Sequence, residues 1–310
     1  MSRSYAFLFP GQGSQYVKMG VELFEAFPVV QELYRHTEEL LGRPISQLIA
    51  RGPRKELTRT QNLQPAITLV NLSCLSVLHE HGVTPVAVAG HSLGEYAAGY
   101  AAGVLDLPGL LSLVNARGTL MEEAATYETG SMIVVNGLDE KKALDVVENA
   151  CGTLAIASHN APFQFVISGE AAGVARARRL AAEAGARRIE QLNVSGAWHS
   201  PLMAPVLGRF AEVLDGTEMQ DARVDVYCNV TAEPERTATA LRQRLLAQLV
   251  SPVRWSATIR HLAEDLPDAT FVEVGPGRVL TGLLLANCRR RRVYNVENLR
   301  SLDRFLASMD

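Results

Sequence analysis

The segment Gly90-His91-Ser92-Leu93-Gly94 has the Gly-x-Ser-x-Gly spacing of a serine nucleophile held in a sharp turn. An apolar run of strand length precedes it at residues 84–89, and a run rich in small residues with helical character follows at residues 95–104. A strand that turns sharply into a helix places the serine at a helix N-terminus, where free backbone N–H groups can stabilise an oxyanion. The sequence therefore predicts that Ser92 is a nucleophile.

A serine hydroxyl becomes reactive when a general base lies within hydrogen-bonding reach. His91 is a poor candidate for this base, because neighbouring side chains at a sharp turn point apart. His199 lies in a loop before Ser200-Pro201, a start signal for the helix expected at residues 202–214. His261 is the alternative, since an α/β-hydrolase carries its histidine after the serine with an acid between them. Loop residues beside a cleft suit chemistry, so the pattern favours His199 and leaves His261 open.

Arg117 stands on the apolar stripe of a helix expected at residues 109–125, in phase with Leu110 and Val114. A buried guanidinium needs an anionic or carbonyl partner, because leaving it unpaired is costly. Two interpretations follow. One is an internal salt bridge, the commoner outcome for a single buried arginine. The other is a receptor for a substrate carboxylate, which the planar, two-pronged guanidinium suits.

A glycine-rich loop at residues 10–14 follows the strand expected at residues 5–9. It lacks the third glycine of a dinucleotide fingerprint and the Gly-Lys-Ser/Thr ending of a phosphate loop. Nucleotide binding is therefore not expected. Further along, a core helix is expected at residues 64–81, with Pro65 in its first turn, where a missing N–H is harmless.

The composition is that of an ordinary globular protein, with 47% hydrophobic and 20% charged residues in 310. A net charge of −3 gives no electrostatic case for nucleic acid or an acidic membrane, and no apolar run reaches bilayer length. The four cysteines are far apart, the histidines show no metal-binding spacing, and the N-terminus carries no signal-peptide pattern. We expect a cytoplasmic protein with no bound metal or cofactor.

The middle of the chain interrupts an otherwise alternating pattern of strands and helices. Residues 129–196 follow the order β-α-β-β-α-β, which is the ferredoxin-like split unit. The strands are expected at residues 131–137, 154–158, 164–168 and 187–194, and the helices at 139–150 and 171–184. The sequence thus predicts an α/β body of residues 1–128 and 197–310, with an inserted small domain and a ligand cleft between the two.

Seven short motifs occur in order along the chain. They are Phe9-Pro10-Gly11-Gln12-Gly13-Ser14-Gln15, Gln64-Pro65-Ala66, residues 90–98, Arg117-Gly118, Gly196-Ala197-Trp198-His199-Ser200, residues 248–255 and Val274-Gly275-Pro276-Gly277. Together they resemble the malonyl-CoA:acyl-carrier-protein transacylase family, which includes the free-standing, trans-acting acyltransferases of polyketide synthases. The resemblance covers essentially the whole chain. It implies a hydrolase-like α/β body with a central, largely parallel sheet and a ferredoxin-like insert.

The resemblance also implies roles for residues of the reaction centre. Ser92 would be the acylated nucleophile and His199 its base. Gln248, through its backbone carbonyl, would orient His199 where a triad uses an acid. The backbone N–H groups of Gln12 and Leu93 would form the oxyanion hole, which explains the glycine-rich loop without a nucleotide.

Further roles concern the acyl group. By resemblance Arg117 would hold the free carboxylate of a malonyl group, while Asn160 and Gln64 would line the cleft. Trp198 stands where malonyl-selective relatives usually carry Phe, and its bulk should disfavour methylmalonyl. Phe163 replaces a residue that is commonly smaller, either for packing in the small domain or for a change on the acceptor side.

The implied reaction is a ping-pong transfer of malonyl from malonyl-CoA to the phosphopantetheine thiol of an acyl carrier protein, in fatty acid or polyketide synthesis. The alternative is a serine acyl hydrolase, such as an editing thioesterase, on the same fold; a hydrolase of neutral acyl groups would not need Arg117. A docking subunit without catalysis is a third possibility, against which Ser92 and His199 speak. The enzyme is expected to be a monomer, and residues 51–55 and 289–292 are candidate basic surfaces for an acidic carrier.

Overall fold

The computed structural model describes residues 4–309, and its body is built on a largely parallel sheet. Within these residues six strands form this sheet, sheet A, in the order β10-β9-β1-β2-β7-β8. The strands are β1 (Tyr5–Phe9), β2 (Ala87–Gly90), β7 (Asp225–Tyr227), β8 (Pro234–Glu235), β9 (Thr270–Val274) and β10 (Val293–Val296). Neighbours are parallel except β7 with β8. The predicted fold class is confirmed for the body.

The central strand β1 shows why both faces of sheet A are covered. Every residue of the strand is buried. Phe7 and Phe9 belong to one apolar cluster, whereas Ala6 and Leu8 belong to another on the opposite face. Because successive side chains of a strand alternate between faces, a continuous apolar strand requires helices on both sides.

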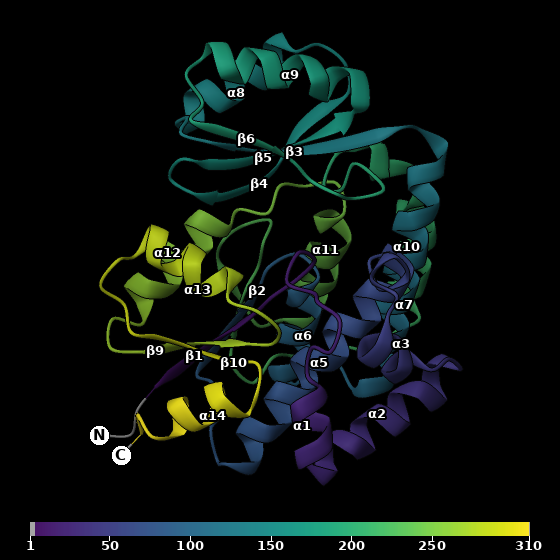
Figure 1. Cartoon of the computed structure of the whole chain (residues 1–310), viewed down its shortest axis with the longest axis vertical. Coiled ribbons are helices and arrows are strands. Elements are labelled where there is room, and N and C mark those ends of the chain that lie inside the picture. The colour runs from purple at the N-terminus through teal and green to yellow at the C-terminus, as the bar shows by residue number, and fades with distance from the viewer. Residues whose placement is uncertain (1–3, 310) are drawn as a thin grey trace.

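The helices of the body form those two covering layers (Figure 1), with α5 and α7 on one side and α12 and α13 on the other. The helices are α1 (Val21–Ala26), α2 (Pro28–Leu41), α3 (Ile45–Arg51), α4 (Arg54–Leu57), α5 (Thr60–Glu80), α6 (Gly94–Ala101), α7 (Leu107–Tyr127), the 3₁₀ helix η1 (Pro201–Val206), α10 (Leu207–Asp215), α11 (Ala238–Gln248), α12 (Trp255–Asp265), α13 (Val279–Asn287) and α14 (Leu299–Leu306).

A second sheet lies apart from sheet A, at the top of Figure 1. In the described part of the chain its four antiparallel strands, sheet B, have the order β4-β5-β3-β6. Its elements are β3 (Gly130–Asn136), α8 (Glu140–Asn149), β4 (Leu154–Ala161), β5 (Gln164–Glu170), α9 (Ala171–Glu183) and β6 (Arg188–Gln191), which confirms the ferredoxin-like order. The helices α8 and α9 cover the face away from the body and share a separate apolar cluster with sheet B. We propose that residues 129–196 fold as one inserted unit.

Helix α5 begins earlier than the sequence suggested. It starts at Thr60, so Pro65 lies inside the helix and the expected first-turn position is wrong. Proline has no N–H to offer the carbonyl four residues before it, here that of Gln61. This carbonyl instead accepts a hydrogen bond from Arg43 Nη2 over 2.9 Å. The replacement bond explains how the helix continues through the proline.

The single helix expected at residues 202–214 is also wrong, because the structure divides it. Residues Pro201–Val206 form η1, and α10 begins only at Leu207. Pro205 has no backbone N–H, so the hydrogen-bond ladder of an α-helix cannot run through its position, and only a short 3₁₀ segment forms there.

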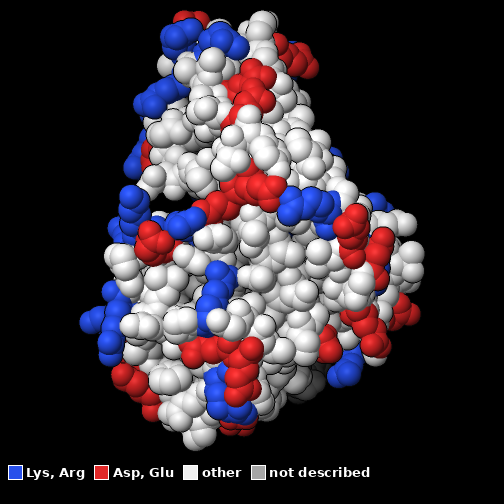
Figure 2. Space-filling view, turned by 90° about the vertical axis from the view of Figure 1, so that its right-hand side faces the viewer, with Lys and Arg blue, Asp and Glu red and all other residues white. Residues whose placement is uncertain are grey.

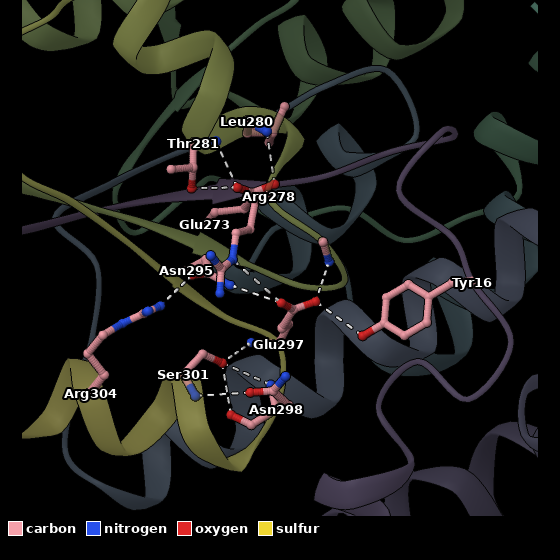
Figure 3. Close-up of polar contacts among 11 residues, drawn as sticks. Tyr16, Glu273, Arg278, Leu280, Thr281, Asn295, Glu297, Asn298, Ser301 and Arg304 are labelled. Atoms are coloured by element: carbon pink, nitrogen blue, oxygen red, sulfur yellow. Dashed lines mark hydrogen bonds and ion pairs between the residues drawn. The ribbon is translucent and has the colours of Figure 1, made fainter.

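Two buried carboxylates fasten the C-terminal elements to the body (Figure 3). Glu297 Oε2 accepts hydrogen bonds from the backbone N–H of Gly277 at 2.8 Å and the hydroxyl of Tyr16 at 3.1 Å. Glu273 accepts from backbone N–H groups of Leu280 and Thr281 at 2.9 and 2.7 Å. This contact caps α13, a helix that borders the cavity described below.

The surface seen in Figure 2 carries acidic and basic side chains side by side, in keeping with a net charge of −3. Among the described helices, none is long and apolar enough to cross a membrane.

Candidate active site

Ser92 lies in a tight turn between β2, which ends at Gly90, and α6, which begins at Gly94. Its φ is 51°, in the left-handed region that costs about 1–3 kcal/mol for a residue with a side chain. Both glycines are required by close approach. A Cβ at Gly90 would lie 2.0 Å from the carbonyl carbon of Gly94, and one at Gly94 would lie 1.9 Å from the carbonyl oxygen of Phe9. The turn therefore has the geometry of a nucleophile elbow.

His199 is the histidine that the structure brings to Ser92. Its Nε2 lies 2.7 Å from Ser92 Oγ, and its Nδ1 lies 2.8 Å from the backbone carbonyl oxygen of Gln248. A carbonyl oxygen can only accept a hydrogen bond, so the proton of the neutral imidazole lies on Nδ1. Nε2 is therefore free to accept the proton of Ser92. Burial, together with the nearby charge of Arg117, lowers the pKa of His199 to about 3, so the imidazole is neutral at ordinary pH.

The other two histidines weighed in the sequence lie elsewhere. His91 Nε2 lies 2.8 Å from Asn160 Oδ1, so the ring points away from the hydroxyl of Ser92. His261 Nδ1 lies 3.0 Å from the carbonyl oxygen of Ala232, beside Glu233. His261 is therefore not placed to activate Ser92, and the choice left open by the sequence resolves to His199.

Arg117 is buried next to the nucleophile, with 1% of its surface exposed. Its Nη2 donates to Ser92 Oγ at 3.2 Å and to Gln248 Oε1 at 3.0 Å, and its guanidinium carbon lies 5.5 Å from the ring centre of Tyr96. Within residues 4–309 no carboxylate forms an ion pair with it. Burial accordingly lowers the pKa of Arg117. The internal salt bridge expected for a buried arginine is absent there.

The glycine-rich loop after β1 packs directly on the elbow. A Cβ at Gly11 would lie 2.3 Å from the carbonyl oxygen of His91 and 3.4 Å from the backbone nitrogen of Leu93. Within the described residues, the backbone N–H groups of Gln12 and Leu93 have no hydrogen-bond acceptor. Gln12 lines the cavity in front of Ser92. Two unpaired N–H groups beside a nucleophile are the requirement for an oxyanion hole.

A cavity of about 350 Å³ opens in front of Ser92, between the body and sheet B. Its lining includes Ser92, His199, Gln12, Asn160 and Trp198 from the set expected in the sequence. The opposite wall comes from the small unit, which contributes apolar Met132, Val134, Val166 and Leu192 together with polar side chains such as Gln164. The expected cleft therefore exists, with Ser92 and His199 in its lining.

Gln64 and Phe163 differ from the other expected residues. Gln64 is fully buried and does not line the cavity; its Nε2 lies 3.2 Å from the sulfur of Met121, which does. Phe163 is 60% exposed in the turn between β4 and β5, so it fills no core position in the small unit.

Comparison with known proteins identifies the family to which this chain belongs. A model of the acyl transferase domain matches residues 6–302. The malonyl CoA-acyl carrier protein transacylase of Bacillus subtilis is 41% identical over 302 residues, which is 96% of this chain and 95% of the relative. The chain belongs to the malonyl-CoA:acyl-carrier-protein transacylase family. The resemblance inferred from seven motifs is thereby confirmed.

Solved structures of this family share the fold. The transacylase of Coxiella burnetii superposes with a TM-score of 0.96 and 34% identity, over 100% of this chain and 98% of that one. A malonyl-transacylase in complex with a type II polyketide acyl-carrier protein, PlMCAT with AntF, gives 0.94 and 37%, over 98% and 99%. The polyketide biosynthesis protein ThaF of Burkholderia thailandensis is 39% identical over 90% of this chain, which is 24% of ThaF.

Three features of this transacylase-family site were not anticipated from the sequence. Asn229 is fully buried behind the elbow, and its side chain bonds to the backbone on both sides of His91. Glu95, in the first turn of α6, accepts a hydrogen bond from the side chain of Gln248. That side chain also donates to the carbonyl oxygen of Ser92 at 3.0 Å. Asn229 carries no motif spacing, and only the burial of polar Glu95 in an alanine-rich helix offered a signal.

No metal-ligand cluster accompanies the site. In the part of the chain that the structure describes, no group of three or more His, Cys, Asp or Glu side chains could hold a metal ion.

Proposed function

We propose that this chain transfers a malonyl group from malonyl-CoA to the phosphopantetheine thiol of an acyl carrier protein, through a malonyl ester on Ser92. The carrier serves fatty acid or polyketide synthesis. One observation carries the proposal: Ser92 Oγ lies 2.7 Å from His199 Nε2 and 3.2 Å from Arg117 Nη2. A base beside the hydroxyl suits acyl transfer, and a guanidinium beside it suits an acyl group with its own carboxylate.

In the first half-reaction, Ser92 Oγ attacks the thioester carbon while its proton passes to His199 Nε2. The oxyanion of the tetrahedral intermediate accepts hydrogen bonds from the backbone N–H groups of Gln12 and Leu93. When the intermediate collapses, the C–S bond breaks and His199 returns the proton to the CoA sulfur. The carbonyl of Gln248 holds Nδ1–H throughout and stabilises the imidazolium.

The second half-reaction repeats these steps with a different thiol. His199 Nε2 takes the proton of the phosphopantetheine thiol, and the sulfur attacks the ester carbon of malonyl-Ser92. The same N–H groups hold the oxyanion. Collapse breaks the bond between carbon and Ser92 Oγ, and His199 returns the proton to that oxygen. The chain is then ready for the next malonyl-CoA.

Arg117 is proposed to select the acyl group. Its Nη2 donates to Ser92 Oγ and Gln248 Oε1, both neutral acceptors. A malonyl carboxylate offers a charged acceptor for the same donors, and charge-assisted hydrogen bonds are about twice as strong as neutral ones. The buried charge, costly without an anion, is thus matched when malonate is bound.

The hydrolase alternative differs in the acceptor that takes the acyl group. The experiment isolates malonyl-enzyme and mixes it with carrier protein bearing phosphopantetheine, with the same carrier lacking it, or with buffer. Intact-mass spectra of both proteins follow the malonyl group. We expect the mass to move to the phosphopantetheine-bearing carrier and to remain on the enzyme in the other two mixtures. Equally rapid loss in buffer would establish the hydrolase instead.

We also propose that the enzyme is a cytoplasmic monomer. All four cysteines lie in the described residues and none is in a disulfide, as expected in a reducing compartment. Light scattering after size-exclusion chromatography checks the oligomeric state. The mass of one chain is expected at all concentrations, and a stable dimer would contradict the proposal.

A further inference from the structure

Asn229 lies behind the nucleophile elbow, and both ends of its side-chain amide are used there. Oδ1 accepts a hydrogen bond from the backbone N–H of Ser92 at 2.7 Å, and Nδ2 donates to the carbonyl oxygen of Gly90 at 2.6 Å. The side chain is fully buried. One amide group therefore holds the two residues that flank His91, where β2 turns into α6.

The pairing of β2 with β7 explains this placement. The parallel register matches Ala89 with Tyr227, and Asn229 follows Tyr227 by two residues, level with His91. At this level the backbone of β2 turns away, since the φ of Ser92 is 51°, and regular pairing stops. The amide of Asn229 supplies one donor and one acceptor, the groups that a further backbone peptide would have supplied.

The backbone of Asn229 is hydrogen-bonded at both its N–H and its carbonyl. Its N–H donates to Glu95 Oε1 at 3.2 Å, and its carbonyl accepts from the N–H of Arg254 at 3.0 Å. The other oxygen of Glu95 accepts from Gln248 Nε2, and the carbonyl of Gln248 orients the catalytic-site histidine. Asn229 is thus linked to the element that positions the base.

We infer that Asn229 is a positioning residue of acyl transfer, which holds Ser92 in its left-handed conformation and keeps the N–H of Leu93 free for the oxyanion. The inference rests on the proposed role of Ser92 as the nucleophile. Of the two adjacent N–H groups, that of Ser92 is bonded to Asn229, while that of Leu93 has no acceptor among the described residues. Without Asn229, the N–H of Ser92 and the carbonyl of Gly90 lose their buried partners, and the turn must relax to satisfy them.

Asparagine is required because the position needs a donor and an acceptor together. Aspartate has the same shape, but its carboxylate cannot donate to the carbonyl of Gly90, and two oxygens would face each other across 2.6 Å. A protonated aspartate regains one O–H donor and keeps one acceptor. Burial disfavours the charged form of such an aspartate, as it does for the neighbouring Glu95, whose pKa it raises to about 7.

The test measures single-turnover malonylation of the full chain by malonyl-CoA, as intact mass after rapid quenching, for wild type, Asn229→Asp and Asn229→Ala. Rates are normalised to the folded fraction from thermal melting. At pH 8 we expect both variants to lose about 100-fold, the effect of a misplacement near 1 Å. As the pH falls to 5, the rate of Asn229→Asp should rise towards wild type while that of Asn229→Ala stays low. A merely structural role would not produce this recovery.

Asn295→Ala is the matched control. Asn295 is also buried with both amide ends bonded, to Glu297 and Arg304, but lies on β10 at the far edge of sheet A. The Asn295→Ala variant should lose stability but keep its malonylation rate per folded molecule. Rates of Asn229→Asp and Asn229→Ala within threefold of wild type at pH 8 would overturn the inference. So would a low rate of Asn229→Asp without recovery at low pH. An absence of malonylation in wild type would instead overturn the proposed function.

A measurement on the wild-type chain tests the inference even if the variants of Asn229 fail to fold. Amide hydrogen exchange, followed by NMR with ¹⁵N-serine or ¹⁵N-leucine labelling, compares the N–H groups of Ser92 and Leu93. The inference expects slow exchange at Ser92, because Asn229 binds that N–H, and faster exchange at Leu93. The reverse order would overturn it regardless of the enzyme's activity.

Discussion

The guanidinium of Arg117 donates a hydrogen bond to the hydroxyl oxygen of Ser92 across 3.2 Å. Arg117 lies on α7 and Ser92 in the turn that precedes α6, and these two helices pack in the same apolar cluster. Within the described residues the guanidinium forms no ion pair with a carboxylate. A buried cation without an ion-pair partner is unfavourable, and under the proposed function the acyl group supplies the anion. Malonate fits this requirement, and acetate in thioester linkage does not.

The acyl selectivity should depend on Arg117. In Arg117→Ala, we expect kcat/KM for malonyl-CoA to fall about 100-fold, because charge-assisted bonds to the carboxylate are lost. Acetyl-CoA makes no such bonds and should lose much less, so the ratio of malonyl to acetyl labelling falls. Arg43→Ala is the control, since Arg43 bonds Asn62, Asn115 and a backbone carbonyl instead. An unchanged ratio in Arg117→Ala would remove the carboxylate receptor from the account.

The pH dependence of malonylation should reflect a base that is hard to protonate. The pKa of His199 is lowered to about 3 by burial and by the charge of Arg117. The neutral, reactive form therefore persists as the pH falls from 8 to 5. Single-turnover rates per folded molecule should stay within about twofold over this range. A rate that falls with a midpoint near pH 6.5, the value of an ordinary histidine, would contradict the buried-base geometry.

The lowered pKa of His199 also predicts a loss of stability in acid. In the unfolded chain His199 binds a proton below about pH 6.5, whereas in the folded chain it does not until about pH 3. The unfolded state therefore binds more protons in this window, and stability falls as the pH falls. Urea unfolding of wild type and His199→Gln isolates this contribution. Relative to the variant, wild type should lose up to about 1.4 kcal/mol of unfolding free energy per pH unit below 6.5. A difference in unfolding free energy that stays constant with pH would contradict the lowered pKa of His199.

Trp198 should exclude a methyl branch on the acyl group. The indole lines the cavity beside Ser92 and is 4% exposed. Trp198→Ser opens this wall, so we expect the ratio of methylmalonyl to malonyl labelling to rise about tenfold. Replacing a buried indole also destabilises the fold, so Trp198→Phe provides an aromatic control with a smaller change. No gain in methylmalonyl labelling with folded Trp198→Ser would show that another residue sets this selectivity.

The elbow itself could be predicted because its determinants are local. Gly90 and Gly94 are needed for contacts within a few residues, and their spacing around Ser92 is visible in the sequence. The burial of Arg117 was visible too, since it follows from helical periodicity. The partner of Arg117 could not be chosen in advance, because a salt bridge or a ligand depends on side chains distant in the chain.

Other parts of the site depend on the three-dimensional fold. The sequence pattern favours His199 but leaves His261 open, and only the folded structure shows that the ring of His199 lies at Ser92. Asn229 was missed, because its role arises where the pairing of β2 with β7 ends. The start of α5 was missed because Pro65 resembled a first-turn proline, while Arg43 compensates for it from the loop between α2 and α3.

The tight turn around Ser92 should not tolerate a side chain at Gly94. Gly94→Ala places a methyl group 1.9 Å from the carbonyl oxygen of Phe9, so the elbow must open and malonylation should fall at least about 100-fold. Gly208→Ala is the matched control, because nothing lies within 4 Å of its Cβ position in α10. That change should raise the free energy of unfolding by about 0.5–1 kcal/mol and leave malonylation unchanged. Equal activity of the two variants would contradict the close approach.

The acylated residue is identified by the intact mass of the enzyme after incubation with malonyl-CoA, followed by peptide mapping. Wild type should gain the mass of one malonyl group on the peptide that contains Ser92, and Ser92→Ala should gain none. Malonylation of Ser92→Ala to the same extent, or of wild type at another residue, would show that Ser92 is not the nucleophile.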